Sequence, residues 1–246
     1  MILRAVAGID GTTTLVGLIG DPVSGSLSPR MQNAAFAARG LDWTYVPLRV
    51  EHAALGDAIA GLAALGFAGA NVTTPHKTGV IPFCNELDES AERAGSVNTL
   101  VIRNAHVTGG STDAEALDEV DASTAAVIGA GGAAGAWIAA LEARGIAVQS
   151  FSRRGEWPPR TDDADLVVHA TPVKDELLFG PRAGQTLIEL AYFPDGRDTA
   201  HAAAAHAAGA TVIDGLEVLA RQGAASFERW TGVPAPLEIM RAAIRP

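Results

Sequence analysis

Little in this sequence points to disulfide bonds, membranes or nucleic acids. Cys84 is the single cysteine, so no disulfide can form within the chain, as is typical of a protein in a reducing cytoplasm. No apolar run approaches the roughly 18–20 residues of a membrane-spanning helix, and the first residues show no secretory signal pattern. Lys and Arg total 18 against 28 Asp and Glu, a formal charge of −10, with no basic stripe. We therefore expect a cytoplasmic protein with no membrane or nucleic-acid partner.

Motifs for metal binding and for cysteine chemistry are also missing. The six histidines include no H-E-x-x-H pattern. His201 and His206 are five residues apart, which places them on different faces of a helix, so we predict no metal site. No His or Asn pattern accompanies Cys84, which we interpret as a small buried hydrophobic residue rather than a nucleophile. His76 is interpreted as a loop residue rather than a base.

The sequence is instead rich in small and apolar residues that alternate between strand and helix patterns. Hydrophobic residues make up 48% of the 246 residues, a length that suits one large or two modest domains. The first half predicts strands at 14–19, 43–50 and 66–70 and helices at 30–38, 53–65, 80–85 and 86–94. This alternation is typical of an α/β layer with a parallel sheet. Pro47 inside the second strand indicates an edge strand or a bulge.

The second half continues the alternation. It predicts strands at 125–128, 145–151, 166–170, 186–190 and 211–213, with helices ending near 143, at 199–208, at 216–230 and at 237–245. Strands and helices in this order are typical of a doubly wound sheet.

Hydroxyl side chains follow the first predicted strand. Ser28-Pro29 opens the first helix, because Ser28 is a good N-cap and Pro29 fits the first helical position. Ser28 therefore has a sufficient structural role as a cap. Ser26, two residues earlier on an irregular loop, has no evident structural role.

A lysine projects from the loop after the third predicted strand, in the stretch Asn71-Val72-Thr73-Thr74-Pro75-His76-Lys77. Pro75 cannot donate to a strand ladder, so the strand should stop there. Strand ends are where α/β proteins position chemistry, because a rigid sheet holds a short exposed loop. Lys77 beside Thr73 and Asn71 is a plausible grip for a small polyol or keto acid. The alternative is a solvated lysine on a capped loop.

Two more polar residues stand at predicted strand ends. Asn98 lies at the mouth of a strand that turns back through a tight hairpin at Asn104. The returning strand leads to Asp113. Asp113 also precedes a helical stretch at 115–120, so an N-cap is its structural alternative.

A glycine turn in the second half carries the signature of a dinucleotide site. The strand at 125–128 is followed directly by Gly129-Ala130-Gly131-Gly132-Ala133-Ala134-Gly135 and a helix. Gly129, Gly131 and Ala134 occupy the small-residue positions of the G-x-G-x-x-G/A fingerprint, and a complete strand–turn–helix–strand unit surrounds them. The helix N-terminus offers N–H groups and partial positive charge to a phosphate.

The end of the next strand predicts the cofactor. NAD-binding proteins place Asp or Glu there to hold the ribose 2′-hydroxyl. This chain has Ser152-Arg153-Arg154. Two guanidinium groups and a hydroxyl can bind a 2′-phosphate that a carboxylate would repel. We therefore predict NADP (NADPH) rather than NAD.

Taken together, these motifs resemble the shikimate/quinate dehydrogenase family over nearly the whole chain. The resemblance rests on Ser26-Leu27-Ser28-Pro29, on Asn71-Val72-Thr73 with Pro75 and Lys77, on Ala94-Gly95 with Val97-Asn98-Thr99, on Thr112-Asp113, on Gly129–Ala133, and on Asp214-Gly215 with Gln222. It implies a two-domain α/β fold: a substrate-binding domain at 1–113 plus 219–246, a Rossmann-type NADP-binding domain at 114–218, and an active site in the cleft between them. It also implies the NADPH-dependent reversible reduction of 3-dehydroshikimate to shikimate in aromatic amino-acid biosynthesis, by a monomer or homodimer.

The resemblance also assigns roles to residues. It implies that Lys77 and Asp113 form the acid/base pair, and our hypothesis is that Lys77 is the main acid/base while Asp113 orients it. The substrate-binding residues implied are Ser26, Ser28, Thr73, Asn98, Tyr192 and Gln222. The cofactor-binding residues implied are Gly129, Ala130, Gly131, Gly132, Ala133, Ser152, Arg153, Arg154, Thr171, Leu190 and Gly215.

The chain departs from the family pattern near the expected sites. Ser111 and Ala114 stand where the family commonly has Asn and Gly around the Thr-Asp pair, and Gly25 stands where His is common. The segment after Arg154 is short, and the usual Ser/Gly-rich loop becomes Pro172–Asp175. Two alternatives therefore remain: a quinate or other hydroxy-acid dehydrogenase of the same family, or a catalytically silent NADP-binding regulator.

Overall fold

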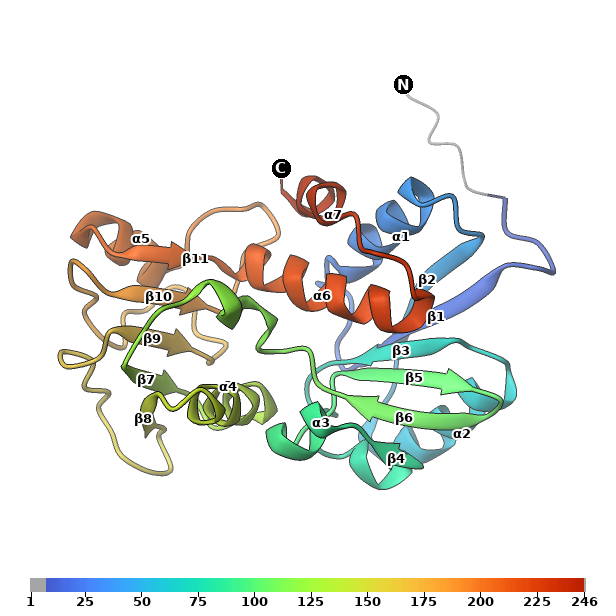
Figure 1. The fold of residues 1–246 in the computed structure, drawn as a ribbon, viewed down its shortest axis with the longest axis horizontal. Coiled ribbons are helices and arrows are strands. Elements are labelled where there is room, and N and C mark those ends of the chain that lie inside the picture. Colours follow the sequence, from blue (N-terminus) through green and yellow to red (C-terminus); the bar gives the residue numbers. More distant parts are fainter. Residues whose placement is uncertain (1–7, 246) are drawn as a thin grey trace.

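The protein, described here as a computed structural model, consists of two α/β halves, each built around its own sheet (Figure 1). The structure describes residues 8–245, so residues 1–7 and 246, which the predicted domains include, lie outside the described part. Within residues 8–245, no helix combines the length and the apolar character needed to cross a membrane.

The first half holds a six-stranded sheet in the order β2-β1-β3-β5-β6-β4. Its elements are β1 (Thr14–Gly20), α1 (Ser28–Ala38), β2 (Trp43–Arg49), α2 (Leu55–Ala64), β3 (Gly69–Val72), β4 (Glu86–Leu87), α3 (Glu89–Ala94), β5 (Thr99–Arg103) and β6 (His106–Gly110). β2 lies at the edge, as Pro47 predicted. Helix α2 covers one face of the sheet through Leu55, Ile59 and Leu62.

The first sheet is mixed: the three strands predicted as a parallel layer are parallel, and the hairpin predicted at Asn104 adds antiparallel strands. β2, β1 and β3 are parallel, but β5 pairs antiparallel with both β3 and β6. A tight turn joins β5 to β6, and Asn104 and Ala105 in it have φ of 52° and 62°. Two consecutive residues with positive φ form the kind of short turn that joins antiparallel strands.

The second half holds a five-stranded parallel sheet in the order β11-β10-β9-β7-β8. Its elements are β7 (Thr124–Ile128), α4 (Gly132–Ala143), β8 (Ala147–Phe151), β9 (Leu166–His169), β10 (Thr186–Glu189), α5 (Ala200–Ala208) and β11 (Thr211–Ile213). Trp137 and Leu141 of α4 pack on one face and Ala205 of α5 on the other, so the sheet is doubly wound, with a Rossmann-type arrangement around the glycine turn.

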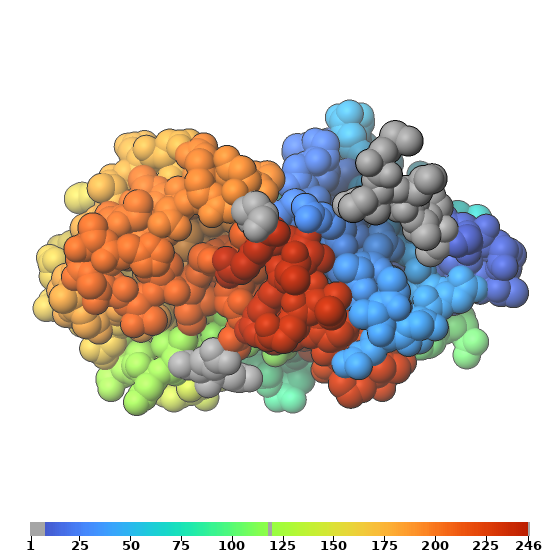
Figure 2. Space-filling model, turned by 90° about the horizontal axis from the view of Figure 1, so that it is seen from above, coloured from blue at the N-terminus to red at the C-terminus, as the bar shows by residue number. Residues whose placement is uncertain are grey.

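The last two helices, α6 (Gly215–Thr231) and α7 (Leu237–Ile244), return to the first half. α6 begins beside the second sheet and runs across to the first (Figure 1). Phe227, Trp230 and Met240 join the core that α1 forms against β1. Viewed from above, these helices, in red, lie between the orange and the blue halves (Figure 2). The chain therefore crosses between the halves twice.

Several local predictions were wrong at the level of single elements. The segment predicted as helices at 80–85 and 86–94 contains a short 3-10 turn at Ile81–Phe83, the strand β4 and only then α3. The third strand runs from Gly69 to Val72 rather than over 66–70. Cys84 is partly buried and packs on the first core, and burial raises the pKa of its thiol to about 11, which fits the predicted inert hydrophobic role.

Candidate active site

Three polar loop segments meet at the edge of the first sheet where β3 and β6 end and β5 begins, because these neighbouring strands alternate in direction. β3 runs toward this edge, β5 runs away from it and β6 returns to it, with Asn71 opposite Thr99. Residues just beyond these strand ends are brought together although they are far apart in the chain. They are Lys77 after β3, Asn98 before β5 and Asp113 after β6.

Lys77 and Asp113 form a close ion pair at this edge. Lys77 Nζ donates to both carboxylate oxygens of Asp113, each at 2.7 Å. The two side chains are only 17% and 9% exposed, so solvent screens their attraction less than on an open surface. Ala114, not Asp113, is the N-cap of the following 3-10 helix η3 (Glu115–Glu119), so the N-cap interpretation of Asp113 is wrong. An ammonium and a carboxylate at this distance can hold and pass one proton.

Asn98 holds the carboxylate of Asp113 in place. The Oδ1 atom of Asn98 accepts a hydrogen bond from the Thr112 backbone N–H at 2.9 Å, which fixes the orientation of its amide. Its Nδ2 then donates to Asp113 Oδ1 at 2.8 Å. The same nitrogen lies 3.4 Å from Gln222 Oε1 on α6. Helix α6 is therefore connected to the ion pair through one buried amide.

A buried layer of polar side chains supports this arrangement from below. Asn71 accepts from the Tyr45 hydroxyl at 2.9 Å and donates to Ser226 Oγ of α6 at 2.9 Å. Ser226 Oγ is also 2.8 Å from Thr99 Oγ1. These groups are buried and hydrogen-bonded, so they fix β3, β5 and α6 relative to one another.

A cavity of about 390 Å³ lies above the ion pair. Every residue predicted for substrate binding or acid/base chemistry lines it: Ser26, Ser28, Thr73, Lys77, Asn98, Asp113, Tyr192 and Gln222. The lining comes from the first half, from α6 and from the second half, which contributes Ala133 of α4 and Leu190 and Tyr192 of the loop after β10. Its volume lies in the range of pockets for small molecules, and its wall is rich in groups that donate to hydroxyls and carboxylates.

The serine loop differs from its sequence prediction. Ser28 is the first residue of α1, and its side chain caps no N–H group; Leu27 is the N-cap. Ser26 Oγ instead accepts from the Ser28 N–H at 3.2 Å, so the two serines exchange the roles that the sequence predicted. The Tyr192 hydroxyl hydrogen-bonds to Ser26 and to the Leu27 backbone, while burial raises the pKa of Tyr192, so it stays a neutral donor.

A larger cavity of about 1030 Å³ adjoins the first and runs along the glycine turn. Ten of the eleven predicted cofactor residues line it: Gly129, Ala130, Gly131, Gly132, Ala133, Ser152, Arg153, Arg154, Thr171 and Leu190. The eleventh, Gly215, lines the smaller cavity instead. The reason is that Gly215 is the first residue of α6, whose N-terminus faces the smaller cavity with Val218 and Gln222.

The glycine turn is shaped to accept a ligand close to its backbone. Gly129 has φ of +141°, and a Cβ there would lie 2.7 Å from the Ala170 carbonyl oxygen, so a side chain does not fit. A Cβ on Gly131, the N-cap of α4, would meet nothing within 4 Å, so the turn is open at that point. The first turn of α4 holds no acidic side chain that would compete for its N–H groups. The turn therefore fits a pyrophosphate.

The far end of the larger cavity carries positive charge and one aromatic ring. Arg153 and Arg154 are exposed on the loop after β8. The Arg153 guanidinium lies 5.8 Å from the ring centroid of Trp157, which is 38% exposed and lines the same cavity. Planar guanidinium groups bind phosphate bidentately and stack on flat rings. This end of the cavity therefore suits a phosphorylated nucleoside.

Lys77 lies where the two cavities join. It lines both of them, together with Gly25, Ala133, Leu190 and Tyr192. The turn into α4 packs directly on the lysine, since a Cβ on Gly132 would lie 3.2 Å from Lys77 Cβ. A group bound along the glycine turn and a group bound above the ion pair would therefore meet beside the lysine ammonium.

Comparison with known proteins agrees with this architecture. The family model described as "Shikimate dehydrogenase substrate binding domain" matches residues 18–100, and the one described as "Shikimate 5'-dehydrogenase C-terminal domain" matches residues 215–245. A shikimate dehydrogenase (NADP(+)) of Anaeromyxobacter sp. (strain Fw109-5) is 39% identical over 96% of this chain and 97% of its own length. The chain belongs to the shikimate dehydrogenase family.

Solved structures of this family share the fold. The shikimate dehydrogenase of Aquifex aeolicus superposes with a TM-score of 0.89 at 29% identity, over 97% of this chain and 100% of its own. The shikimate 5-dehydrogenase of Thermus thermophilus, solved in complex with NADP(H) and shikimate, gives a TM-score of 0.84 at 29% identity, over 94% and 98% of the two chains. Our predictions of family and fold class are confirmed.

Several residues in or beneath the two cavities are absent from the predicted site residues. Asn71 was expected beside Lys77 and Thr73 as a possible grip for a small polyol or keto acid, and it lines the smaller cavity, although the substrate-binding set implied by the resemblance omits it. Ser226 follows Gln222 by one helical turn and so shares its face. Trp157 and Lys174 line the larger cavity. They stand in irregular loops, where no periodic pattern marks which side chains face inward.

Proposed function

We propose that this chain catalyses the NADPH-dependent reversible reduction of 3-dehydroshikimate to shikimate, in aromatic amino-acid biosynthesis. The observation that supports this most directly is the Lys77–Asp113 pair, with both oxygens 2.7 Å from the ammonium, at the junction of a polar 390 Å³ cavity and a 1030 Å³ cavity along a glycine turn. A catalytically silent regulator has no need of this pair, so we favour the enzyme.

The residues of the larger cavity fit the cofactor. The N–H groups at the start of α4 would hold its pyrophosphate, while Arg153 and Arg154 would hold the 2′-phosphate that distinguishes NADP from NAD. When bound, the cofactor supplies hydride to the substrate ketone. One structural relative was solved with shikimate and NAD. Membership of the family therefore does not decide between the two cofactors, and our prediction of NADP for this chain rests on the two arginines.

Lys77 and Asp113 would perform the proton transfer. The ketone oxygen gains negative charge as hydride arrives, and a proton at Lys77 Nζ neutralises it. Asp113 orients the ammonium and accepts from a substrate hydroxyl, and Asn98 holds the carboxylate. The remaining lining groups would bind the carboxylate and hydroxyls of the substrate ring: Ser26, Ser28, Thr73, Asn98, Tyr192 and Gln222.

We further propose the domain division that the family resemblance implies. The substrate domain would comprise residues 1–113 and 219–246, and the NADP domain residues 114–218. In support, Val218 packs with the core of the second sheet, whereas Ala220 and Phe227 of the same helix pack with the first. We also propose a cytoplasmic enzyme that acts on small molecules as a monomer or homodimer, which size-exclusion chromatography with light scattering would test.

Absorbance at 340 nm tests the function directly. The purified chain is assayed with shikimate and with quinate, each with NADP and with NAD. We expect the highest kcat/KM for shikimate with NADP. A higher kcat/KM for quinate would make the chain a quinate dehydrogenase. Binding of NADPH without turnover of either acid would make it a regulator.

A further inference from the structure

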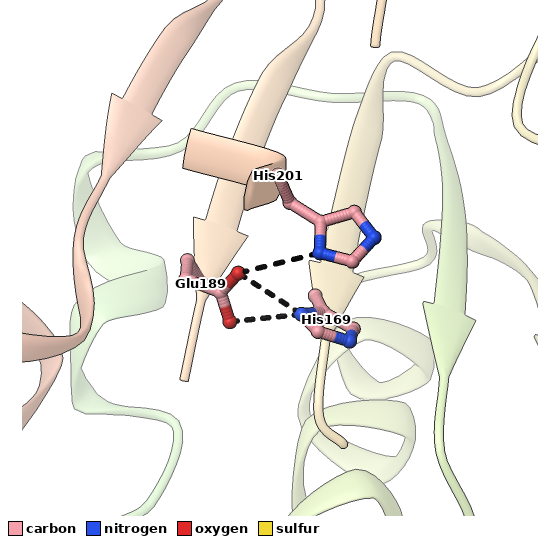
Figure 3. A group of neighbouring side chains, drawn as sticks. All are labelled: His169, Glu189 and His201. Atoms are coloured by element: carbon pink, nitrogen blue, oxygen red, sulfur yellow. Dashed lines mark hydrogen bonds and ion pairs between the residues drawn. The ribbon is translucent and has the colours of Figure 1, made fainter. Parts of the chain in front are cut away.

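A buried polar cluster lies behind the larger cavity and is used by no step proposed above. It consists of His169 at the end of β9, Glu189 at the end of β10 and His201 in the first turn of α5, with exposed fractions of 0%, 1% and 0%. Figure 3 shows the three side chains pointing toward one another from these elements. Buried ionisable groups are costly unless they are paired, so the cluster calls for an explanation.

The residue types would suit a metal ion, because two His and one Glu can hold zinc. Their ligand atoms lie within 4.8 Å of one another. The hydrogen bonds argue against this. The backbone N–H of Leu178 donates to His201 Nε2 at 2.8 Å, so that nitrogen carries no proton and Nδ1 carries it instead. A metal at Nδ1 would move the proton to Nε2, directly against the Leu178 N–H.

The carboxylate of Glu189 also has its partners within the protein. It accepts from the Ala191 backbone N–H at 3.0 Å and from the Thr199 hydroxyl at 2.8 Å. His169 Nδ1 lies 2.9 Å from each of its oxygens. Burial, together with the neighbouring His169, lowers the pKa of His201 to about 4, so His201 is neutral at pH 7. The ring nitrogens of His169, the carboxylate of Glu189 and His201 Nε2 therefore form one hydrogen-bonded network, whereas His201 Nδ1 makes no hydrogen bond and lies 3.9 Å from a carboxylate oxygen of Glu189.

The network is attached at three points to the loop that borders the larger cavity. His169 Nε2 lies 2.6 Å from Thr171 Oγ1, and His201 Nε2 accepts from the Leu178 backbone. Between them, the Ala200 N–H of α5 donates to the Lys174 carbonyl at 2.7 Å. Thr171, Lys174 and Leu178 all line the cavity. The 171–178 loop has no helix or strand of its own, so its shape depends on these three bonds together with the Arg197–Asp175 ion pair and the packing of Lys174 over Phe193.

We propose that His169 and Glu189 are positioning residues for NADPH, which act by holding Thr171 and the 171–178 loop against the cofactor. The Thr171 hydroxyl is the contact point, because it touches His169 on one side and accepts from the Val173 N–H at 3.2 Å on the other. The inference rests on the proposed function, since it assigns the loop to NADPH. It predicts that the cluster influences cofactor affinity while leaving the Lys77–Asp113 pair untouched.

Two variants remove the same hydrogen bond from its two ends. His169→Asn keeps a donor for Glu189 but cannot reach Thr171, and Thr171→Val removes the hydroxyl. We expect each to raise the Kd of NADPH about fivefold to tenfold, the range for one lost hydrogen bond of this kind. Titration calorimetry measures this without turnover. We expect the double variant to match Thr171→Val, because that change already removes the bond to His169 together with the bond from the Val173 N–H. Thr171→Ser, which keeps the hydroxyl, should retain wild-type affinity.

The outcomes separate this inference from the proposed function. If the wild-type chain binds no NADPH, the proposed function itself fails. If the wild type binds NADPH but Thr171→Val and His169→Asn bind it equally well, or if their effects add fully, the positioning role is wrong. Should His169→Asn fail to fold, Thr171→Val against Thr171→Ser decides alone. Elemental analysis that found one zinc per wild-type chain and none in His201→Ala would replace the hydrogen-bonded network with a metal site.

Discussion

The two ends of the active-site cleft are built differently. At the substrate end, Asn71, Asn98 and Asp113 are buried and fixed by strand register and by hydrogen bonds of 2.8–2.9 Å. At the far cofactor end, Arg153 and Arg154 stand exposed on a loop. Proton transfer needs atoms held within tenths of an ångström, whereas attraction of a phosphate tolerates a flexible charge. The comparison suggests that the substrate end determines rate and the cofactor end determines affinity.

Replacing the two lysines one at a time is the strongest test of whether the substrate end determines rate and the cofactor end determines affinity. Lys77 and Lys174 are the only lysines in the sequence, and both line the larger cavity. We expect Lys77→Met to lower kcat by about 10²–10⁴-fold, because it removes the proposed proton donor. Lys174→Met should change the KM for NADPH a few-fold, with kcat close to wild type. Steady-state kinetics with both substrates varied measures the difference. Near-normal turnover by Lys77→Met would refute its assignment as acid/base.

The arginine pair gives the next largest expected effect. Arg153→Ala with Arg154→Ala should lower the NADP/NAD ratio of kcat/KM by about tenfold or more, since each charged hydrogen bond to phosphate contributes on the order of 1.5 kcal/mol or above. Arg160→Ala is the matched control, because Arg160 is exposed on the same loop, pairs with Glu156 and lies outside the cavity lining. An unchanged ratio in the double variant would place the 2′-phosphate elsewhere.

The fluorescence of Trp157 can be used to detect binding at the cofactor end. Trp137 and Trp230 are at most 1% exposed and Trp43 is partly buried, whereas Trp157 is 38% exposed inside the larger cavity. We expect NADPH to quench tryptophan emission, and Trp157→Leu to remove most of that quench. The same change should weaken NADPH binding about twofold to fivefold, as for an exposed stacking contact. Equal quenching in wild type and variant would show that the cofactor does not approach this ring.

The smallest expected effect concerns the anchor of α6, which carries Gln222 into the substrate cavity. Burial acts to raise the pKa of Glu217, but hydrogen bonds from Arg241 and Arg221 outweigh it and lower the pKa below 4.5. A lowered folded-state pKa gives stability that is present above the unfolded pKa and is lost as pH falls through the folded one. Glu217→Gln should therefore cost about 1–2 kcal/mol at pH 7 and less at pH 3, because protonation of Glu217 removes the charged interaction as the pH falls.

Urea unfolding at both pH values measures this difference. Glu238→Gln is the matched control, because Glu238 also pairs with Arg241 but its side chain is 83% exposed. A loss of stability in Glu217→Gln that is the same at pH 3 and pH 7 would show that the charge of Glu217 contributes nothing. The anchoring of α6 would then depend on interactions other than the charge of Glu217.

Features formed by a few consecutive residues could be predicted from the sequence, whereas contacts between residues far apart in the chain could not. The glycine turn, the strand before Lys77 and the Arg153–Arg154 pair each carry their meaning in a few consecutive residues. The exchange of roles between Ser26 and Ser28 depends instead on the angle at which the loop enters α1. The His169–Glu189–His201 network joins residues from three separate elements, and no pattern in the sequence indicates that these three side chains meet.

The contact between Gly132 and Lys77 has a consequence for engineering. The nucleotide-binding half touches the stem of the lysine where a Cβ would come within 3.2 Å of both Lys77 and Ser96. A chimaera that grafted a foreign dinucleotide module onto this substrate half would need glycine at that position. A larger residue would require the stem of Lys77 or Ser96 to move by a few tenths of an ångström. The small space beside Gly132 therefore limits which dinucleotide-binding modules could replace the present one.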